Sequence, residues 1–129
     1  MHAGQVTVTA RWSVSRLVAV VTLTPDRPGF HLYGLTPATT KLGIPTRIEV
    51  TGGARVSGEA SADRAITVLH YPALDVDLSV YPDGPVTVTV PLTLIGTHPP
   101  ELLITYAACS DSVCLAPVRA LPVTPSRES

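Results

Sequence analysis

Frequent proline and glycine residues restrict the fold of this chain more than any other feature. The 129 residues include 13 prolines and 9 glycines. No stretch free of both shows the i, i+3, i+4 and i+7 apolar spacing of an amphipathic helix. Proline also lacks the amide hydrogen that the interior of a helix needs. The sequence therefore predicts a fold with under about 10% helix, well below the usual helix content of globular proteins.

Between these breaks, apolar and polar residues alternate as they do in half-buried strands. Residues 6–13 place Val6, Val8, Ala10 and Trp12 on one face, and residues 86–94 repeat the pattern with valine and leucine opposite threonine. Pro91 within the second segment predicts an edge or bulged position. Further strands are expected in residues 17–24, 30–33, 46–51, 55–59, 65–71, 102–108 and 113–123.

The number and spacing of these segments predict the fold class. Seven to nine short strands, separated by turns about every 8 to 12 residues, favour an all-β, immunoglobulin-like two-sheet antiparallel β-sandwich, with a closed barrel as the alternative. We expect at least about 40% strand, against a usual 20–25%. The residues expected inside are Trp12, Leu17, Val21, Leu23, Ile48, Val88, Val90, Leu92, Leu94 and Ile104.

Length and composition predict one folded domain over residues 1–129, with a core at about 6–123 and a frayed tail or linker at 124–129. Hydrophobic residues make up 45% and charged residues 15%, with a net charge of −1. Without a basic cluster, nucleic acid is not an expected partner. The longest apolar run, residues 17–23, is too short to insert in a membrane. Residues 1–5 lack the pattern of a signal peptide. We expect a monomer.

Two cysteines, Cys109 and Cys114, stand on either side of four residues and between two expected strands. A hairpin loop of four residues places them opposite each other, and facing residues of an antiparallel pair are close enough for a disulfide. A disulfide that closes about six residues removes little entropy from the unfolded chain, about 2 kcal/mol. The spacing thus favours reversible redox chemistry, and a local structural disulfide remains the main alternative.

Other residues near the pair say less about its chemistry. A zinc site needs about four ligands, which the surrounding sequence does not supply, so no metal or other cofactor is expected. Asp111 lies in the loop, where it either assists thiol protonation or stabilises the turn through the backbone. With no lysine or arginine closer in sequence than Arg119, the pair is expected to be a relay whose partner carries the activated cysteine.

The run from Cys109 to Pro117 resembles the cysteine motif of the N-terminal, immunoglobulin-like domain of DsbD-type thiol:disulfide interchange proteins. Three further segments are similar to that family in the same order: residues 28–33, 43–46 and 88–93. The resemblance spans about residues 6–123. It implies a periplasmic or extracytoplasmic electron-transfer domain with Cys109 and Cys114 as its redox pair. The implied partners are a membrane electron donor and thioredoxin-like proteins, and the resemblance favours Cys109 as the sulfur that a partner attacks.

The resemblance also implies an aromatic cap loop over the cysteines. By order, this loop falls at about residues 70–80, where Tyr71 or Leu74 is the candidate lid. Tyr106, three residues before Cys109, and Tyr33 are further candidates to line the site, although tyrosines in a sandwich usually serve the core.

A different class of function is also compatible with this sequence. Immunoglobulin-like sandwiches often act in binding or assembly without catalysis, and fold alone does not decide function. In such a module the hairpin disulfide is structural. The ease with which the disulfide is reduced distinguishes the two hypotheses.

Overall fold

The computed structural model describes residues 1–35 and 44–128. Strand content is 58%, and the described residues contain no helix, so none that could cross a membrane. The strands are β1 (His2–Ala3), β2 (Val6–Ser13), β3 (Val18–Pro25), β4 (His31–Leu32), β5 (Arg47–Gly52), β6 (Ala54–Val56), β7 (Ser61–Ala62), β8 (Thr67–Tyr71), β9 (Val76–Val80), β10 (Val86–Leu94), β11 (Pro100–Tyr106), β12 (Ala108–Cys109), β13 (Val118–Val123) and β14 (Ser126–Glu128). The predicted all-β class is confirmed.

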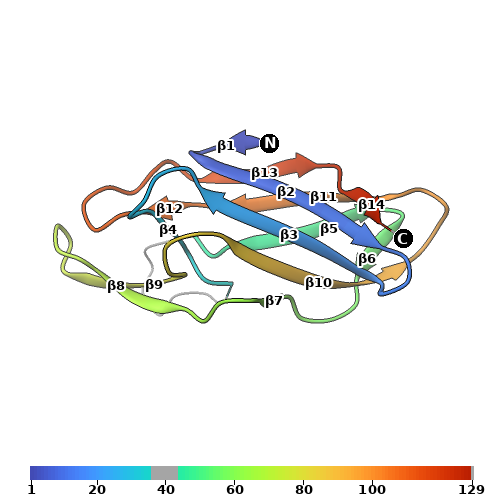
Figure 1. The fold of residues 1–129 in the computed structure, drawn as a ribbon, viewed down its shortest axis with the longest axis horizontal. Coiled ribbons are helices and arrows are strands. Elements are labelled where there is room, and N and C mark those ends of the chain that lie inside the picture. Colours follow the sequence, from blue (N-terminus) through green and yellow to red (C-terminus); the bar gives the residue numbers. More distant parts are fainter. Residues whose placement is uncertain (36–43, 129) are drawn as a thin grey trace.

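Two main sheets form an immunoglobulin-like sandwich (Figure 1). One follows the order β1-β2-β3-β10-β6, with β14 added to β2 and β7 to β10, and the other follows β13-β11-β5. Two short pairs, β12-β4 and β8-β9, lie together at one end of the molecule. The cysteines lie at this end, because β12 continues the line of β11.

Alternating residues from both sheets fill the core. In β10, Val86, Val88, Val90 and Leu92 are buried, while the threonines between them are partly exposed. In β11, Leu102, Ile104 and Tyr106 face the same core from the other sheet. This period-2 burial is the pattern read from the sequence.

Most of the predicted core residues are inside, and two are not. Leu17 is 43% exposed because it lies in the turn between β2 and β3 with a φ of 53°. Leu94 is 36% exposed at the end of β10. Ile48 is half-buried, and the other seven are buried. Both errors fall where a strand ends and its apolar face no longer has the other sheet above it.

Two expectations, one about Pro91 and one about the tail, need correction. Of the edge or bulged position predicted for Pro91, the edge is wrong, because β10 has neighbours on both sides. Pro91 falls between the residues that pair with β7 and those that pair with β6, so the ladder is already interrupted there. The expected tail also contains a strand, since β14 pairs in parallel with β2, and Glu128 forms ion pairs with Arg11 and Arg16.

The β8–β9 hairpin is attached to the rest of the molecule mainly through β9. Tyr33 forms a bridge with Val80, and the Gly34 amide donates to the Ser79 carbonyl at 3.1 Å. A Cβ atom at position 34 would lie only 2.9 Å from the side chain of Ile66, so glycine at this position allows Ile66 to pack close to the backbone. The hairpin is thereby held next to the cysteines.

Candidate functional site

The cysteine pair closes a tight loop at the end of the sandwich. Cys109 and Cys114 form a disulfide with 4.1 Å between their Cα atoms, and they face each other as an isolated antiparallel bridge. Backbone hydrogen bonds from Ser110 to Val113 and from Leu115 to Ala108 flank the bridge. The four-residue loop predicted from the spacing is therefore present.

Ser110 stabilises this loop, which the sequence analysis did not anticipate. Its hydroxyl oxygen accepts from the backbone amides of Ser112 at 3.2 Å and Val113 at 3.0 Å. Serine often makes such contacts to backbone amides two and three residues ahead in turns. The serine directly after Cys109 could therefore have indicated from the sequence that the loop is stabilised in this way. Asp111 is exposed, and no hydrogen bond of its carboxylate is found within the described residues.

The two cysteines differ sharply in exposure. Cys109 is fully buried (0% exposed) because it ends β12, which pairs with β4. Cys114 is exposed, because the chain has left the sheet by that point. The sequence reading favoured Cys109 as the attacked sulfur, but only Cys114 of the pair is exposed to a partner.

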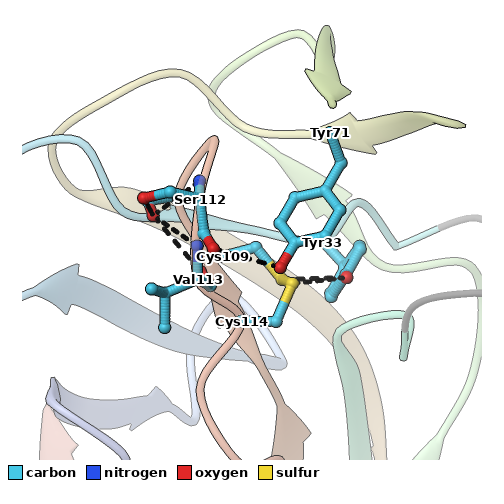
Figure 2. The surroundings of a disulfide bond; sticks show 7 residues. Tyr33, Tyr71, Cys109, Ser112, Val113 and Cys114 are labelled. Carbon is cyan, nitrogen blue, oxygen red and sulfur yellow. Dashed lines mark hydrogen bonds between the residues drawn. A yellow bond between two sulfur atoms is a disulfide. The ribbon is translucent and has the colours of Figure 1, made fainter. Parts of the chain in front are cut away.

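Tyr33 contacts the disulfide directly. Its hydroxyl oxygen lies 2.9 Å from Cys109 Sγ and 3.8 Å from Cys114 Sγ (Figure 2). Burial of the ring, with a smaller contribution from Tyr71, raises the pKa of the Tyr33 hydroxyl. Tyr33 therefore keeps its proton at neutral pH and is available as a donor to sulfur.

Tyr71 ends β8 and reaches the cysteine loop from the neighbouring hairpin. Its hydroxyl donates to the backbone carbonyl of Ser112 at 3.2 Å, and the side chain is half-buried. Leu74, the other candidate lid residue, is 57% exposed in the turn of the hairpin. The aromatic contact from this region is thus made by Tyr71.

Tyr106 does not lie at the disulfide. It is fully buried in the main core, and its hydroxyl donates to the Ala3 carbonyl at 2.7 Å. Burial raises its pKa to about 12, with a smaller effect of Asp26. The period-2 pattern of β11 explains this placement, since Tyr106 shares its face with Leu102 and Ile104.

A shallow cavity of about 160 Å³ opens onto the disulfide. Besides the cysteines and Tyr33, it is lined by Ile44, Ala107, Leu115 and Pro117. Its wall is apolar, and no cluster of metal-ligating side chains is found in the described part of the chain. This arrangement can shield a disulfide and admit a thiol to one of its sulfur atoms.

Comparison with known proteins gives a match among solved structures. No protein-family model and no curated protein sequence matches the chain. Among solved structures, the chain is similar to the DsbD N-terminal domain of Neisseria meningitidis, crystallised in the reduced form, with a TM-score of 0.59 and 15% identity. The match covers 92% of this chain and 86% of that one. The chain therefore has the fold of a DsbD N-terminal domain, with a cysteine pair joined as a disulfide at one end of its sandwich.

Proposed function

We propose that this chain is a thiol:disulfide interchange domain outside the cytoplasm. In this proposal the Cys109–Cys114 pair receives reducing equivalents from a membrane partner and passes them to thioredoxin-like proteins. The observation that carries the proposal is the unequal burial of the two cysteines, because exchange requires a disulfide sulfur that an attacking thiolate can reach, and the exposed Cys114 provides it. The likeness of fold to a DsbD N-terminal domain agrees with this role.

The reaction begins at Cys114. A thiolate of the donor attacks Cys114 Sγ and forms a mixed disulfide, while the Cys109–Cys114 bond breaks and its electron pair leaves with Cys109. Cys109 then takes up a proton. A second donor thiolate attacks the donor sulfur of the mixed disulfide and releases Cys114 as a thiolate, so that the donor is oxidised and the domain reduced. Transfer to an acceptor disulfide runs through the same steps in reverse.

Tyr33 and Tyr71 assist in different ways. The Tyr33 hydroxyl donates to the sulfur of Cys109 as charge develops there, and hydrogen bonding to a charged form favours that form. Tyr71 covers the loop from the side of β8 and restricts access until a partner displaces it. Because the hairpin is a two-stranded unit, moving it does not require the main sheets to open.

Single-cysteine variants test this assignment. C109A leaves Cys114, which is expected to alkylate rapidly and to trap a thioredoxin-like protein lacking its second cysteine. C114A leaves the buried Cys109, which is expected to react at least about tenfold more slowly until the protein is denatured. Equal rates in the two native variants would contradict the proposed order of attack. Failure of both to form a mixed disulfide would favour a structural disulfide in a binding module.

A further inference from the structure

An open cavity carrying two arginines adjoins the disulfide. It has a volume of about 420 Å³, and its lining includes Arg47, Arg119 and Thr105. Ile44 belongs both to this cavity and to the smaller one that opens onto the cysteines. The two hollows therefore share a wall and lie side by side.

Strand register explains why the arginines come together. Arg47 in β5 is paired with Thr105 in β11, and a register shift opposite Thr105 brings Arg119 and Ala120 of β13 to the same level. The Ala120 amide donates to Thr105 Oγ1 at 3.0 Å. Paired residues of neighbouring strands present their side chains on the same face. This face is the outer one, since the flanking residues Ile104 and Tyr106 are buried.

The linings of the two cavities come within two residues of each other along the chain. Pro117 lines the cysteine cavity and Arg119 lines the basic one. Two residues of extended chain span no more than about 7 Å. A small peptide is therefore long enough to extend from one cavity into the other.

The combined surface is positive, although the whole chain has a net charge of −1. Among the described residues that line the two cavities, Arg47 and Arg119 carry charged side chains, and none of the others is acidic or basic. Arg47 Nε lies 3.4 Å from Glu49 Oε1, which compensates part of its charge. A guanidinium has five N–H donors in a planar array that suits a carboxylate, so this contact leaves Arg47 able to bind another.

We propose that the two cavities together bind a small peptide-like thiol that carries a carboxylate. The thiol lies against Cys114, and the carboxylate lies between Arg47 and Arg119. This inference rests on the proposed function, because the ligand reacts with the same disulfide. A small molecule is favoured because the basic cavity has the volume typical of small-molecule sites, about 300–1,000 Å³.

The reaction consumes two molecules of the thiol. The first, as a thiolate, attacks Cys114 Sγ, which forms a mixed disulfide and releases Cys109 to take up a proton. The second attacks the ligand sulfur of that mixed disulfide, which releases a small-molecule disulfide and a Cys114 thiolate that is then protonated. Two thiols are oxidised to one disulfide, the protein disulfide becomes a dithiol, and two protons pass from the thiols to the protein.

Glutathione and its diethyl ester are suitable probes, since both carry the same thiol but only glutathione has free carboxylates. The rate of opening of the oxidised protein is measured by mass spectrometry after acid quench. Each rate is divided by that of the same thiol with a small-molecule disulfide, which removes the difference in intrinsic reactivity. For the wild type at low salt, we expect the corrected rate to be several-fold higher with glutathione, and the advantage to shrink at high salt.

Charge-neutral variants locate the effect. R47Q/R119Q is expected to lose the preference for glutathione while its rate with the ester stays unchanged. R55Q removes an exposed arginine in β6, remote from the disulfide, and is expected to keep the preference. In wild type, the non-reactive S-methylglutathione is expected to shift the amide resonances of Arg47 and Thr105, and these shifts should be absent in R47Q/R119Q.

Two results would overturn this inference: equal corrected rates for the two thiols in wild type, or a preference that survives in R47Q/R119Q. Neither result contradicts the proposed function as long as a reduced thioredoxin-like protein still opens the disulfide. If neither small thiols nor that protein open it, the proposed function fails as well.

Discussion

At the scale of single residues, the contact between Tyr33 and Cys109 is the one on which the proposed mechanism depends most. Cys109 is fully buried, and in the proposed mechanism its sulfur accepts negative charge when Cys114 is attacked. The Tyr33 hydroxyl, 2.9 Å away, is a hydrogen-bond donor placed to stabilise that charge. Burial otherwise disfavours a thiolate.

Tyr33→Phe is therefore expected to slow opening of the disulfide by about tenfold or more, because a hydrogen bond to a charged group contributes about 1.5–3 kcal/mol. Stopped-flow reduction by dithiothreitol measures the effect. Tyr81→Phe is the matched control, since the hydroxyl of that buried tyrosine accepts a hydrogen bond from the Leu35 amide and makes no contact with a cysteine among the described residues. An unchanged rate in Tyr33→Phe would remove Tyr33 from the mechanism.

Tyr106 predicts a dependence of stability on alkaline pH. Its pKa is about 12 in the folded protein, above the ordinary 10. Between these values the folded chain holds a proton that the unfolded chain has lost, so the free energy of unfolding falls as the pH rises from about 10 to about 12. Below about pH 10 this contribution is fully present. Chemical denaturation at pH 9 to 12 should show the decline, and it should be smaller in Tyr106→Phe measured over the same range.

At the scale of elements, the β8–β9 hairpin lies next to the cysteines, with Leu78 and Val80 of β9 packed in the same cluster as Cys109 and β8 more exposed. It forms a separate two-stranded sheet, and an isolated hairpin has little stability of its own. On its outer strand, Val68 is 67% exposed, and so contributes little to packing. The hydroxyl of Tyr71 joins the hairpin to the cysteine loop. Loss of this contact should free the approach to Cys114 without loosening the sandwich.

Tyr71→Ala is thus expected to accelerate reduction of the disulfide by a small thiol several-fold, while the free energy of unfolding falls by only about 1–2 kcal/mol. Val68→Ala, on the same strand but directed to solvent, should change neither. Paired kinetic and denaturation measurements distinguish the cases. A slower reaction in Tyr71→Ala would mean that Tyr71 orders the loop for attack rather than covering it.

At the scale of the whole molecule, the disulfide lies outside the interactions that hold the two sheets together. The main core extends through β2, β3, β10 and β11, whereas Cys109 packs in a smaller cluster with Tyr33, Leu78, Val80 and Ala107. The loop that the disulfide closes is short. Function and stability should therefore be separable.

The double variant C109A/C114A is expected to lose about 2 kcal/mol or less of unfolding free energy and all exchange activity. The reduction potential of the wild-type disulfide should lie above about −300 mV, the range of readily exchanged disulfides. Thermal melts and equilibration against a glutathione or dithiothreitol series measure both. A lower potential together with a large loss of stability would identify a structural disulfide instead.

The sequence by itself determined the all-β class, most of the core and the cysteine loop, because each depends on local patterns. Alternation decides which face of a strand is buried, as in β10, and a spacing of four residues decides that Cys109 and Cys114 meet. Strand ends were the exception, as Leu17 and Leu94 show, because burial there depends on how far the opposite sheet extends.

Only the tertiary structure decided which residues complete the site. Tyr33 reaches Cys109 from 76 residues away in the sequence, and Tyr71 reaches Ser112 from 41 residues away. Tyr106 looked suitable by its closeness in sequence, yet its strand turns it into the core. The unequal exposure of the cysteines likewise follows from the pairing of β12 with β4, which covers Cys109 and leaves Cys114 beyond the sheet. Contacts between distant segments have no local pattern, so a single sequence does not contain them in readable form.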